Sequence, residues 1–498
     1  MKVDVVAAPL PEVKADALVV GVHADDKGLR DPVARLDRAL RGRLAALVAA
    51  ERFQARAGQV THCHVDGGAS AARVVLVGLG RRDEVTAETL RRAAAVGLRR
   101  ARDLGARAVA IEAFGERVPI RRRAHALVEG ALLAAYAFDR YKREKSDRHV
   151  QSVRLVEADR RVTREAADGA RRGETFAQGT WLARDLINTP AIDLHPADLA
   201  RQAAQVARAG RLRLTVYDRA ACRRLGMGAF LGVAAGSAQP PKFIHLRYTP
   251  RGRARRRIAV IGKGITFDSG GLDLKSADGM LRMKYDMAGA GAVLGIMRAL
   301  PALRPPVEVH GLVAACENMP SGTAIRPGDV LRAMNGTSIE IGNTDAEGRL
   351  TLADAICYAR ERVKADEIID MATLTGACVV ALGTLCAGLM ANDQTLAQRV
   401  LVAAEAAGER VWQLPLIDEY KEQFKGDVGD LNNTGGRNAG AITAGLFLKE
   451  FAGTTPWAHL DIAGPAFTEK ELPLGPKGAT GMAVRTILEY LCGDGRQA

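Results

Sequence analysis

Carboxylate side chains occur in three short segments of this 498-residue chain, two of which contain glycine. Residues 260–275 run from an apolar, strand-like stretch into a glycine-broken loop, residues 283–286 precede a Gly/Ala-rich helix pattern, and residues 343–350 alternate acids with small residues. The four carboxylates are Asp268, Asp286, Asp345 and Glu347. Because ligands collect at the carboxyl ends of strands in α/β sheets, we expect these polar groups to form a site.

The chemistry of four converging carboxylates depends on cations. Like charges in one site repel and raise one another's pKa unless positive ions share them. Oxygen-rich ligands suit divalent Mn, Mg or Zn, and bridging carboxylates hold two ions about 3.5–4 Å apart. Such ions lower the pKa of a bound water towards about 7 and polarise a carbonyl or phosphoryl oxygen. Lys275 and Arg349 would stabilise the developing oxyanion or bind an anion that assists the reaction. Spacing alone leaves an alternative, in which the acids are surface salt-bridge partners or ordinary turn residues.

The second part of the chain carries a series of motifs in a specific order. Residues 343–350 have the sequence NTDAEGRL. The others are LGMGAFLGVAAGS (225–237), VIGKGITFDSGG (260–271) followed by Lys275, MKYDM (283–287), ENMPSGTAIRPGDVL (317–331), DMATLTGA (370–377), NAGAITAGLFLKEF (438–451) and WAHLDIAGPAF (457–467). This pattern resembles the leucyl aminopeptidase family, the cytosolic exopeptidases with two metal ions, whose hallmark octapeptide is NTDAEGRL. The resemblance covers most of residues 180–490, whereas residues 1–160 show only a compatible α/β pattern.

The resemblance implies two overlapping ligand sets. The more exchangeable metal ion would be held by Asp268, Asp345 and Glu347. The tighter ion would be held by Lys263, Asp268, Asp286 and Glu347, so that Asp268 and Glu347 bridge the two ions. A lysine ligand must be neutral, and burial beside two dications lowers its pKa in that direction.

The resemblance also implies the reaction, which is release of N-terminal residues, leucine among them, from peptides. In the family, the residue matching Lys275 polarises the scissile carbonyl, and the residue matching Arg349 holds a bicarbonate that acts as general base. The free α-amine of the substrate binds one metal, which restricts cleavage to the N-terminus. Met283, Thr373 and Gly376 match positions that line the apolar pocket for the first side chain. The implied cofactors are two divalent ions per subunit, Mn or Zn, and the implied assembly is a homohexamer.

Two positions depart from the family pattern without removing a ligand. Asp273, preceded by Leu272, adds an acid close to Lys275, and Tyr285 stands where small residues are common. A related hydrolase acting on phosphoesters is an alternative reading, which the lysine pair and the complete octapeptide disfavour.

Alternating strand-like and helix-like patterns predict an α/β protein of two domains. We expect a smaller, macro-like N-terminal domain over residues 1–160 and a larger catalytic domain with a mixed central sheet over residues 161–498. A connecting helix at about 161–187 would end before Pro190. In the first domain, one helix is predicted over residues 32–52.

Basic residues exceed acidic ones, and the excess lies in the front of the chain. Residues 1–300 carry a net charge of +22, and residues 301–498 carry −8. The alternative function is therefore a DNA-binding accessory protein that uses its basic N-terminal half. Its candidate phosphate-binding segments are 91–102, 121–123, 142–148 and 251–257. Aromatic residues make up only 4 % of the chain, which gives little support for stacking on single strands.

Three further features bear on location and on other metal sites. Seven cysteines without a CxxC pair suit a reducing, cytoplasmic location. The uncharged stretch 371–392 is long enough to span a membrane, but its Thr and Gly residues favour a buried strand and a Gly-rich loop, so no membrane partner is expected. Only His62 and His64 of the HCH triplet point to one face of a strand, and without a further ligand we expect a structural role for them.

Overall fold

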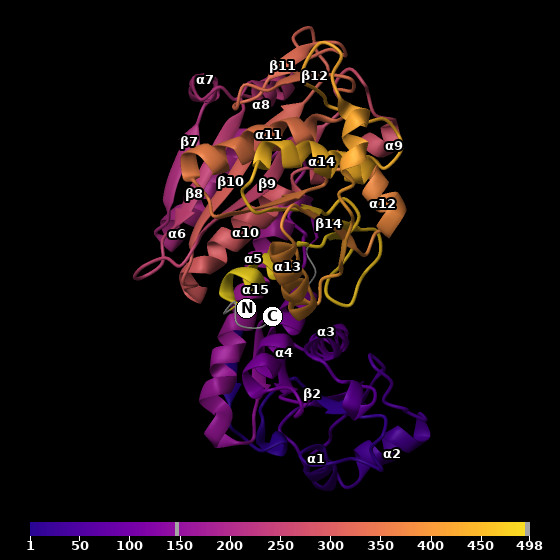
Figure 1. Cartoon of the computed structure of the whole chain (residues 1–498). Helices are drawn as coiled ribbons and strands as arrows, with labels where there is room; N and C mark the ends of the chain where they lie inside the picture. The colour runs from indigo at the N-terminus through magenta and orange to yellow at the C-terminus, as the bar shows by residue number, and fades with distance from the viewer. Residues whose placement is uncertain (145–148, 494–498) are drawn as a thin grey trace. The chain divides into compact units, whose positions relative to one another are not determined.

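The computed structural model describes residues 1–144 and 149–493, and the chain forms two compact units (Figure 1). The division falls within helix α5 (Thr163–Asn188), in the region expected to be a connecting helix. Both units combine helices with a sheet, which confirms the predicted two-domain α/β class. The first unit comprises residues 1–178 and 470–477, and the second comprises residues 179–469 and the described residues from 478 onward.

A six-stranded sheet forms the centre of the first unit. Its strand order is β1-β6-β5-β2-β4-β3, and every neighbouring pair is parallel except β3–β4. The strands are β1 (Lys2–Val6), β2 (Ala17–Val22), β3 (Val60–His64), β4 (Arg73–Gly78), β5 (Ala108–Glu112) and β6 (Ser152–Val156). The helices are α1 (Val33–Ala39), α2 (Arg43–Ala50), α3 (Ala87–Asp103) and α4 (Ile120–Ala135).

The single helix predicted over residues 32–52 is wrong, because two short helices, α1 and α2, occupy this segment. Arg41 and Gly42 between them have left-handed φ values of 57° and 81°, which a right-handed helix does not accommodate. The Asp37 carboxylate then accepts a hydrogen bond from Leu44 N–H at 2.7 Å and satisfies a free donor at the start of α2.

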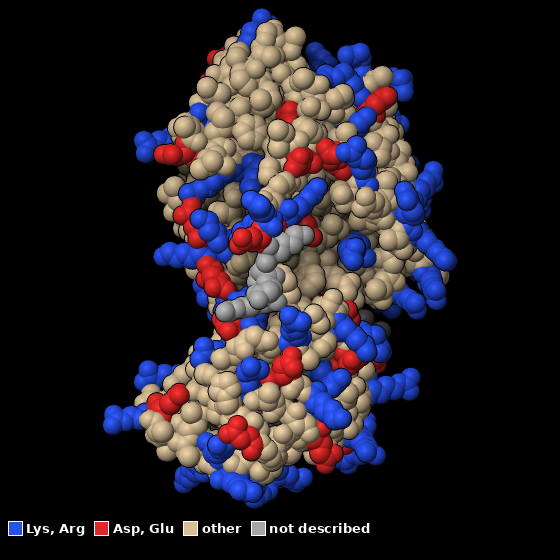
Figure 2. Space-filling view, turned by 180° about the vertical axis from the view of Figure 1, so that it is seen from behind, with Lys and Arg blue, Asp and Glu red and all other residues tan. Residues whose placement is uncertain are grey.

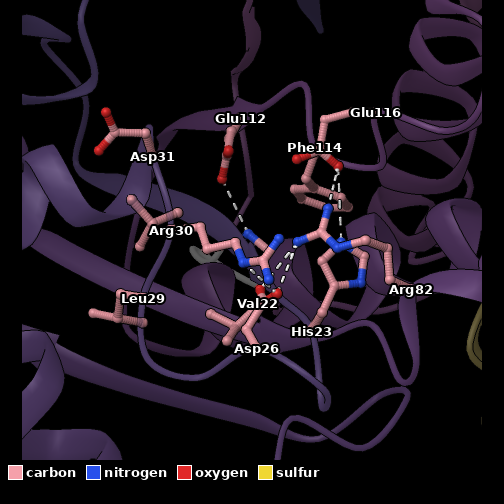
Figure 3. A pocket seen from close by; sticks show the side chains of 12 residues that line it. Val22, His23, Asp26, Leu29, Arg30, Asp31, Arg82, Glu112, Phe114 and Glu116 are labelled. Carbon is pink, nitrogen blue, oxygen red and sulfur yellow. Dashed lines mark hydrogen bonds and ion pairs between the residues drawn. The ribbon is translucent and has the colours of Figure 1, made fainter.

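A hollow in the first unit opens at the carboxyl ends of the neighbouring strands β2 and β5 (Figure 3). Arg82 in this hollow is paired, since it lies 2.9 Å from Asp26 and 3.1 Å from Glu116. Glu112 lines the hollow with a buried carboxyl group that accepts a hydrogen bond from Gly21 N–H at 3.1 Å. Burial raises the pKa of Glu112 to about 8, so this carboxyl group is protonated at neutral pH.

The second unit is built on an eight-stranded mixed sheet with the order β15-β14-β17-β13-β9-β10-β8-β7. The four central strands β17, β13, β9 and β10 run parallel, and β14 and β8 are antiparallel to the strands beside them in this group. The strands are β7 (Arg213–Tyr217), β8 (Lys242–Tyr248), β9 (Arg257–Asp268), β10 (Glu308–Asn318), β13 (Glu367–Ala372), β14 (Ala387–Ala391), β15 (Val411–Gln413) and β17 (Trp457–Asp461). Shorter strands are β11 (Val330–Arg332), β12 (Ser338–Glu340), β16 (Leu431–Asn432), β18 (Phe467–Thr468) and β19 (Gly478–Ala479).

Helices cover both faces of this sheet. Ile261 of β9 packs into the apolar cluster formed with α8, α11 and α14, whereas the next residue, Gly262, faces α10. A Cβ at Gly262 would lie 2.3 Å from the carbonyl oxygen of Gly289, so the glycine allows strand and helix backbones to approach closely. The helices are α6 (Pro196–Gly210), α7 (Arg219–Arg224), α8 (Gly228–Val233), α9 (Ala277–Met280), α10 (Ala288–Leu303), α11 (Glu347–Tyr358), α12 (Gly376–Leu382), α13 (Gln394–Ala407), α14 (Gly440–Ala452) and α15 (Val484–Cys492).

Two apolar stretches were candidates for a membrane span by composition. Residues 371–392 form the end of β13, helix α12 and strand β14, so the predicted buried strand is confirmed, although part of the expected loop is a short helix. The stretch Ala277–Leu303, which comprises α9, a 3-10 turn and α10, is long and apolar enough to cross a membrane by length and composition alone, and most of its apolar window is buried within the protein.

Candidate active site

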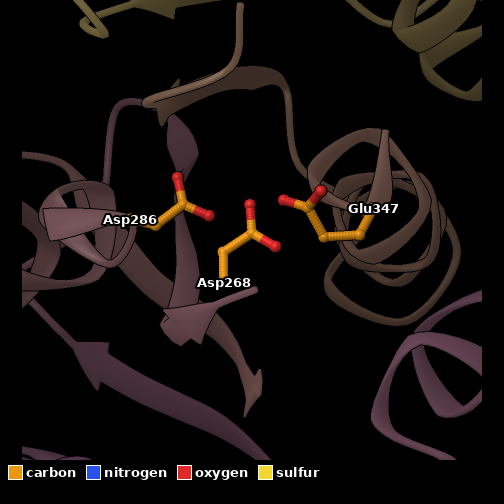
Figure 4. A group of neighbouring side chains, drawn as sticks. All are labelled: Asp268, Asp286 and Glu347. Atoms are coloured by element: carbon orange, nitrogen blue, oxygen red, sulfur yellow. The ribbon is translucent and has the colours of Figure 1, made fainter. Parts of the chain in front are cut away.

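Three of the four predicted carboxylates meet at the carboxyl edge of the central parallel strands. Asp268 is the last residue of β9, Asp286 follows a short 3-10 turn and precedes α10, and Glu347 is the first residue of α11. One carboxylate oxygen from each lies within 4.8 Å of the others (Figure 4). All three residues are buried, at 5 % exposure or less, so their charges need nearby cations.

Lys263 brings a positive charge into this group. Its Nζ lies 2.9 Å from Asp286 Oδ2 and 2.7 Å from Glu347 Oε1, and it donates a hydrogen bond to the carbonyl oxygen of Thr373 at 3.0 Å. Burial opposes the charge on Lys263, but the surrounding carboxylates outweigh it and raise the pKa of the ammonium group. Lys263 is therefore protonated among these acids, and binding of a dication to the same acids favours the neutral amine that a ligand must be.

Lys275 connects the fourth carboxylate to the group. Its Nζ lies 3.0 Å from Asp268 Oδ2 and also pairs with Asp345 Oδ1. Asp345 lies outside the three-carboxylate group and is more open to solvent, with 32 % of its side chain exposed. Burial lowers the pKa of Lys275, but Asp268, Glu347 and Asp345 together raise it above its usual value. Lys275 is thus a cationic hydrogen-bond donor at the open side of the site.

The loop that carries Lys275 is held by contacts that the motifs did not assign. Asn318, at the end of β10, donates from Nδ2 to Asp268 Oδ1 at 2.9 Å and to the carbonyl oxygen of Thr344 at 3.0 Å. The Asp273 carboxylate accepts from Thr344 N–H at 2.7 Å and from its hydroxyl at 3.0 Å. The acid that departs from the family pattern therefore links the Lys275 loop to the segment of Asp345. In the sequence, Asp273 was marked only as an added acid close to Lys275, and Asn318 was not singled out.

The remaining predicted residues lie on elements around this group. Thr373 directly follows β13, and its hydroxyl donates to Asp286 Oδ1 at 2.8 Å. Met283 begins the 3-10 turn before Asp286 and is half-buried. Gly376 begins α12, and a Cβ added there would meet no atom within 4 Å among the described residues. Arg349 lies in the first turn of α11, with its guanidinium 5.9 Å from the centre of the Phe447 ring.

The donor set of this group suits divalent cations. Most of the donor atoms are hard carboxylate oxygens, which are the ligands that Mn and Mg prefer. The nitrogen of Lys263 as an additional ligand is compatible with Zn. Asp286 Oδ2, Asp345 Oδ1 and Glu347 Oε1 are buried atoms that lie against ammonium groups, Lys263 Nζ beside the Asp286 and Glu347 oxygens and Lys275 Nζ beside the Asp345 oxygen. Buried acceptor atoms of this kind cost free energy unless a cation coordinates them. Within residues 1–144 and 149–493, Asp268, Asp286 and Glu347 are the only acid, His or Cys side chains grouped closely enough to hold a metal.

His62 and His64 do not form part of such a group within the described residues. Both lie on β3, with their ring centres 5.8 Å apart. His62 Nδ1 accepts a hydrogen bond from Arg100 Nη2 at 3.1 Å, so its lone pair is already used. This contact supports a structural role for His62.

The basic segments considered for DNA binding contain arginines that are paired with acids. Arg123 lies 2.8 Å from Glu157, and Arg256 lies 2.8 Å from Glu367. Figure 2 shows Lys and Arg side chains interspersed with Asp and Glu on the face in view. Residues 145–148 of the segment 142–148 lie outside the described residues. DNA binding stays a prediction that none of these contacts favours.

Comparisons with known proteins agree on one family. The catalytic domain of the cytosol aminopeptidase family matches residues 181–488, and the N-terminal domain of that family matches residues 19–145. A probable cytosol aminopeptidase of Alkaliphilus oremlandii is 43 % identical over 491 residues, 98 % of each chain. One from Thermosynechococcus vestitus is 44 % identical over 495 residues, 99 % of each chain.

Solved structures give the same result. The bottromycin maturation enzyme BotP, in complex with Mn, is 38 % identical with a TM-score of 0.85, over 96 % of this chain and 99 % of that one. A mutant of tomato leucine aminopeptidase is 36 % identical with a TM-score of 0.90, over 99 % of this chain and 96 % of that one. The resemblance seen in the motifs is thereby confirmed. This chain belongs to the cytosol aminopeptidase family and is a metal-dependent enzyme that removes N-terminal residues from peptides.

Proposed function

We propose that two divalent metal ions bind in the carboxylate group and that leucine is among the N-terminal residues released. The observation that carries this proposal is the buried meeting of Asp268, Asp286 and Glu347 within 4.8 Å. Asp268, Asp345 and Glu347 would hold one ion, and Lys263, Asp268, Asp286 and Glu347 the other. When bound, the ions polarise the scissile carbonyl and increase the acidity of water. Mn or Zn is proposed, and the Mn complex of BotP supports the former.

Lys275 acts on the carbonyl oxygen of the scissile bond. Its pKa is raised, so the side chain stays an ammonium group and donates to the negative charge that develops on that oxygen. Its present contacts are Asp268 and Asp345, which hold it at the group without burying it completely. The substrate's oxygen would take the place of one of these acceptors.

Arg349 would hold a bicarbonate, which would supply a general base for water at this site. Its side chain is 9 % exposed, and its Nε has no hydrogen-bond partner among the described residues. A buried guanidinium with a free donor is an anion-binding group. Burial lowers the pKa of Arg349 to about 10, which still leaves the group charged at neutral pH.

The side chain of the N-terminal residue would lie against Met283, Thr373 and Gly376. Met283 offers an apolar, adaptable surface, and Gly376 leaves room because it has no side chain. The free α-amine of the peptide would bind one of the metal ions, so an acylated N-terminus should not be accepted. A cytoplasmic location and a homohexamer complete the proposal; both follow from the family resemblance, and light scattering of the purified protein tests the latter.

The test is hydrolysis of leucine p-nitroanilide by the purified, full-length protein. The protein is first treated with a chelator, and Mn, Zn, Mg or Co is then added back, with N-acetyl-leucine p-nitroanilide as the matched blocked substrate. Metal-restored cleavage of the free-amine substrate alone supports the proposal. Cleavage of the blocked substrate, or activity that survives complete chelation, contradicts it. Bis-p-nitrophenyl phosphate tests for the phosphoesterase alternative.

A further inference from the structure

Asp461 is a buried acid that the proposed reaction leaves without a role. It is the last residue of β17, it is 0 % exposed, and it stands opposite Ala372, the last residue of the parallel strand β13. Among the described residues, its carboxylate oxygens accept hydrogen bonds from two backbone amides and one hydroxyl group. A fully buried carboxylate costs free energy unless hydrogen-bond donors satisfy it. The donors of Asp461 therefore show which segments of the chain this carboxylate holds in place.

The donors come mainly from the segment that follows β13. Asp461 Oδ1 accepts from Leu374 N–H at 3.2 Å and from Ala463 N–H at 3.1 Å, and Oδ2 accepts from the Thr375 hydroxyl at 2.7 Å. The Thr375 oxygen in turn accepts from Cys378 N–H at 3.0 Å and caps α12. Asp461 therefore fixes Leu374 and Thr375, the second and third residues after β13.

The same short segment touches the metal-binding group. Thr373, one residue before Leu374, donates its hydroxyl proton to Asp286 Oδ1 at 2.8 Å. The carbonyl oxygen of Thr373 accepts from Lys263 Nζ at 3.0 Å. A shift of the segment would therefore move the partner atoms of two proposed ligands, Asp286 and Lys263, at once.

Buried side chains join β17 and β13 at the residues before Asp461. His459, two residues earlier on β17, is in register with Asp370 of β13 and pairs with its carboxylate through Nδ1. The Asp370 carboxylate also accepts from Trp457 Nε1 at 2.6 Å. All three side chains are 0 % exposed. The two strand ends are thus tied together below the point where Asp461 reaches across.

We propose that Asp461, acting through Thr375 and the backbone of Leu374, is a positioning residue that holds Thr373 against Asp286 and Lys263 and so sets the affinity of the site for its metal ions. The inference rests on the proposed function of this site. Groups that orient metal ligands in this way contribute about 10–100-fold to metal affinity or activity.

The test measures Mn²⁺ binding to the chelator-treated, full-length protein by titration, with no substrate present. Thr375→Val removes the hydroxyl that reaches Asp461, and Asp461→Asn keeps the size of the side chain while replacing an acceptor oxygen. We expect both substitutions to raise the Kd for Mn²⁺ by about 10–100-fold. Thr375→Ser keeps the hydroxyl and should bind Mn²⁺ as the wild type does.

A matched control separates positioning from general loosening. The Thr486 hydroxyl donates to the buried carboxylate of Glu409 at 2.6 Å, the same kind of pair, on α15 rather than beside Asp286. Thr486→Val should lose stability yet keep the wild-type Kd for Mn²⁺. The inference is overturned if a folded Thr375→Val binds Mn²⁺ with wild-type affinity, or if Thr486→Val weakens Mn²⁺ binding as much as Thr375→Val does. If Asp461→Asn does not fold, the result for Thr375→Val decides the question. Absence of Mn²⁺ binding by the wild type overturns the proposed metal site itself.

Discussion

A single methyl group at Gly348 should disturb the site through Lys263. A Cβ added at Gly348 would lie 2.7 Å from both Nζ and Cε of Lys263. An ordinary contact is about 3.5 Å, so the lysine end must move by about 0.8 Å. It has little freedom to do so, because Lys263 is 3 % exposed and its Nζ is held by Asp286, Glu347 and the carbonyl oxygen of Thr373.

Two opposing effects decide the outcome for stability. Replacing glycine by alanine within a helix stabilises it by up to about 1 kcal/mol, whereas overpacking a close-packed interior costs about 1–3 kcal/mol. The free energy of unfolding of Gly348→Ala should therefore fall by no more than about 3 kcal/mol. Misplacing a site group by about 1 Å, by contrast, costs on the order of 100-fold in rate. A 100-fold loss of rate corresponds to about 2.7 kcal/mol, so activity should fall clearly in a variant that stays folded.

The assay compares Gly348→Ala with Gly322→Ala, where an added Cβ meets no described atom within 4 Å. Both full-length variants are measured for free energy of unfolding, Kd for Mn²⁺, and kcat/KM with leucine p-nitroanilide. We expect a decrease of about 10–100-fold in Mn²⁺ affinity and in kcat/KM for Gly348→Ala, and wild-type values for Gly322→Ala. A folded Gly348→Ala with wild-type Mn²⁺ affinity and kcat/KM would refute the reasoning that Lys263 is held rigidly at this site.

Three further predictions concern Glu347 and Lys275 of the site and Glu112 of the first unit. Glu347→Ala should abolish peptidase activity and lower the metal content, measured by elemental analysis, because it removes a carboxylate proposed to be shared by both ions. Lys275→Ala should lower kcat by about 100-fold or more with metal content retained, and loss of the metal would contradict its role at the carbonyl. Because the folded state raises the pKa of Glu112 from 4.5 to about 8, it binds this proton more tightly than the unfolded chain, so stability falls as pH rises between these values. Glu112→Gln should remove that fall, on the order of a few kcal/mol, in unfolding curves measured from pH 4 to pH 9, and an unchanged pH profile would show that Glu112 is not the group responsible.

The fold class and the family could be read from the sequence because they depend on local patterns. The periodicity of apolar residues that marks a strand or a helix lies within that single element. The octapeptide at 343–350 likewise holds Asp345 and Glu347 two positions apart in the sequence, whatever the fold. The helix break at Arg41 and Gly42 was missed, since a left-handed arginine leaves no clear mark in the sequence.

Contacts between distant segments were decided only by the tertiary structure. The order of the parallel strands brings Asp268, Asn318, Thr373 and Asp461 to one edge, although they span almost 200 residues of chain. The same order sets which acids contact the same lysine. Lys263 contacts both Asp286 and Glu347, whereas Asp345 contacts Lys275, which in turn contacts Asp268. The residue types and their local spacing therefore determined which chemistry is available to this chain. The sheet decided which side chains act together, because strand order and register place segments side by side that the sequence keeps far apart.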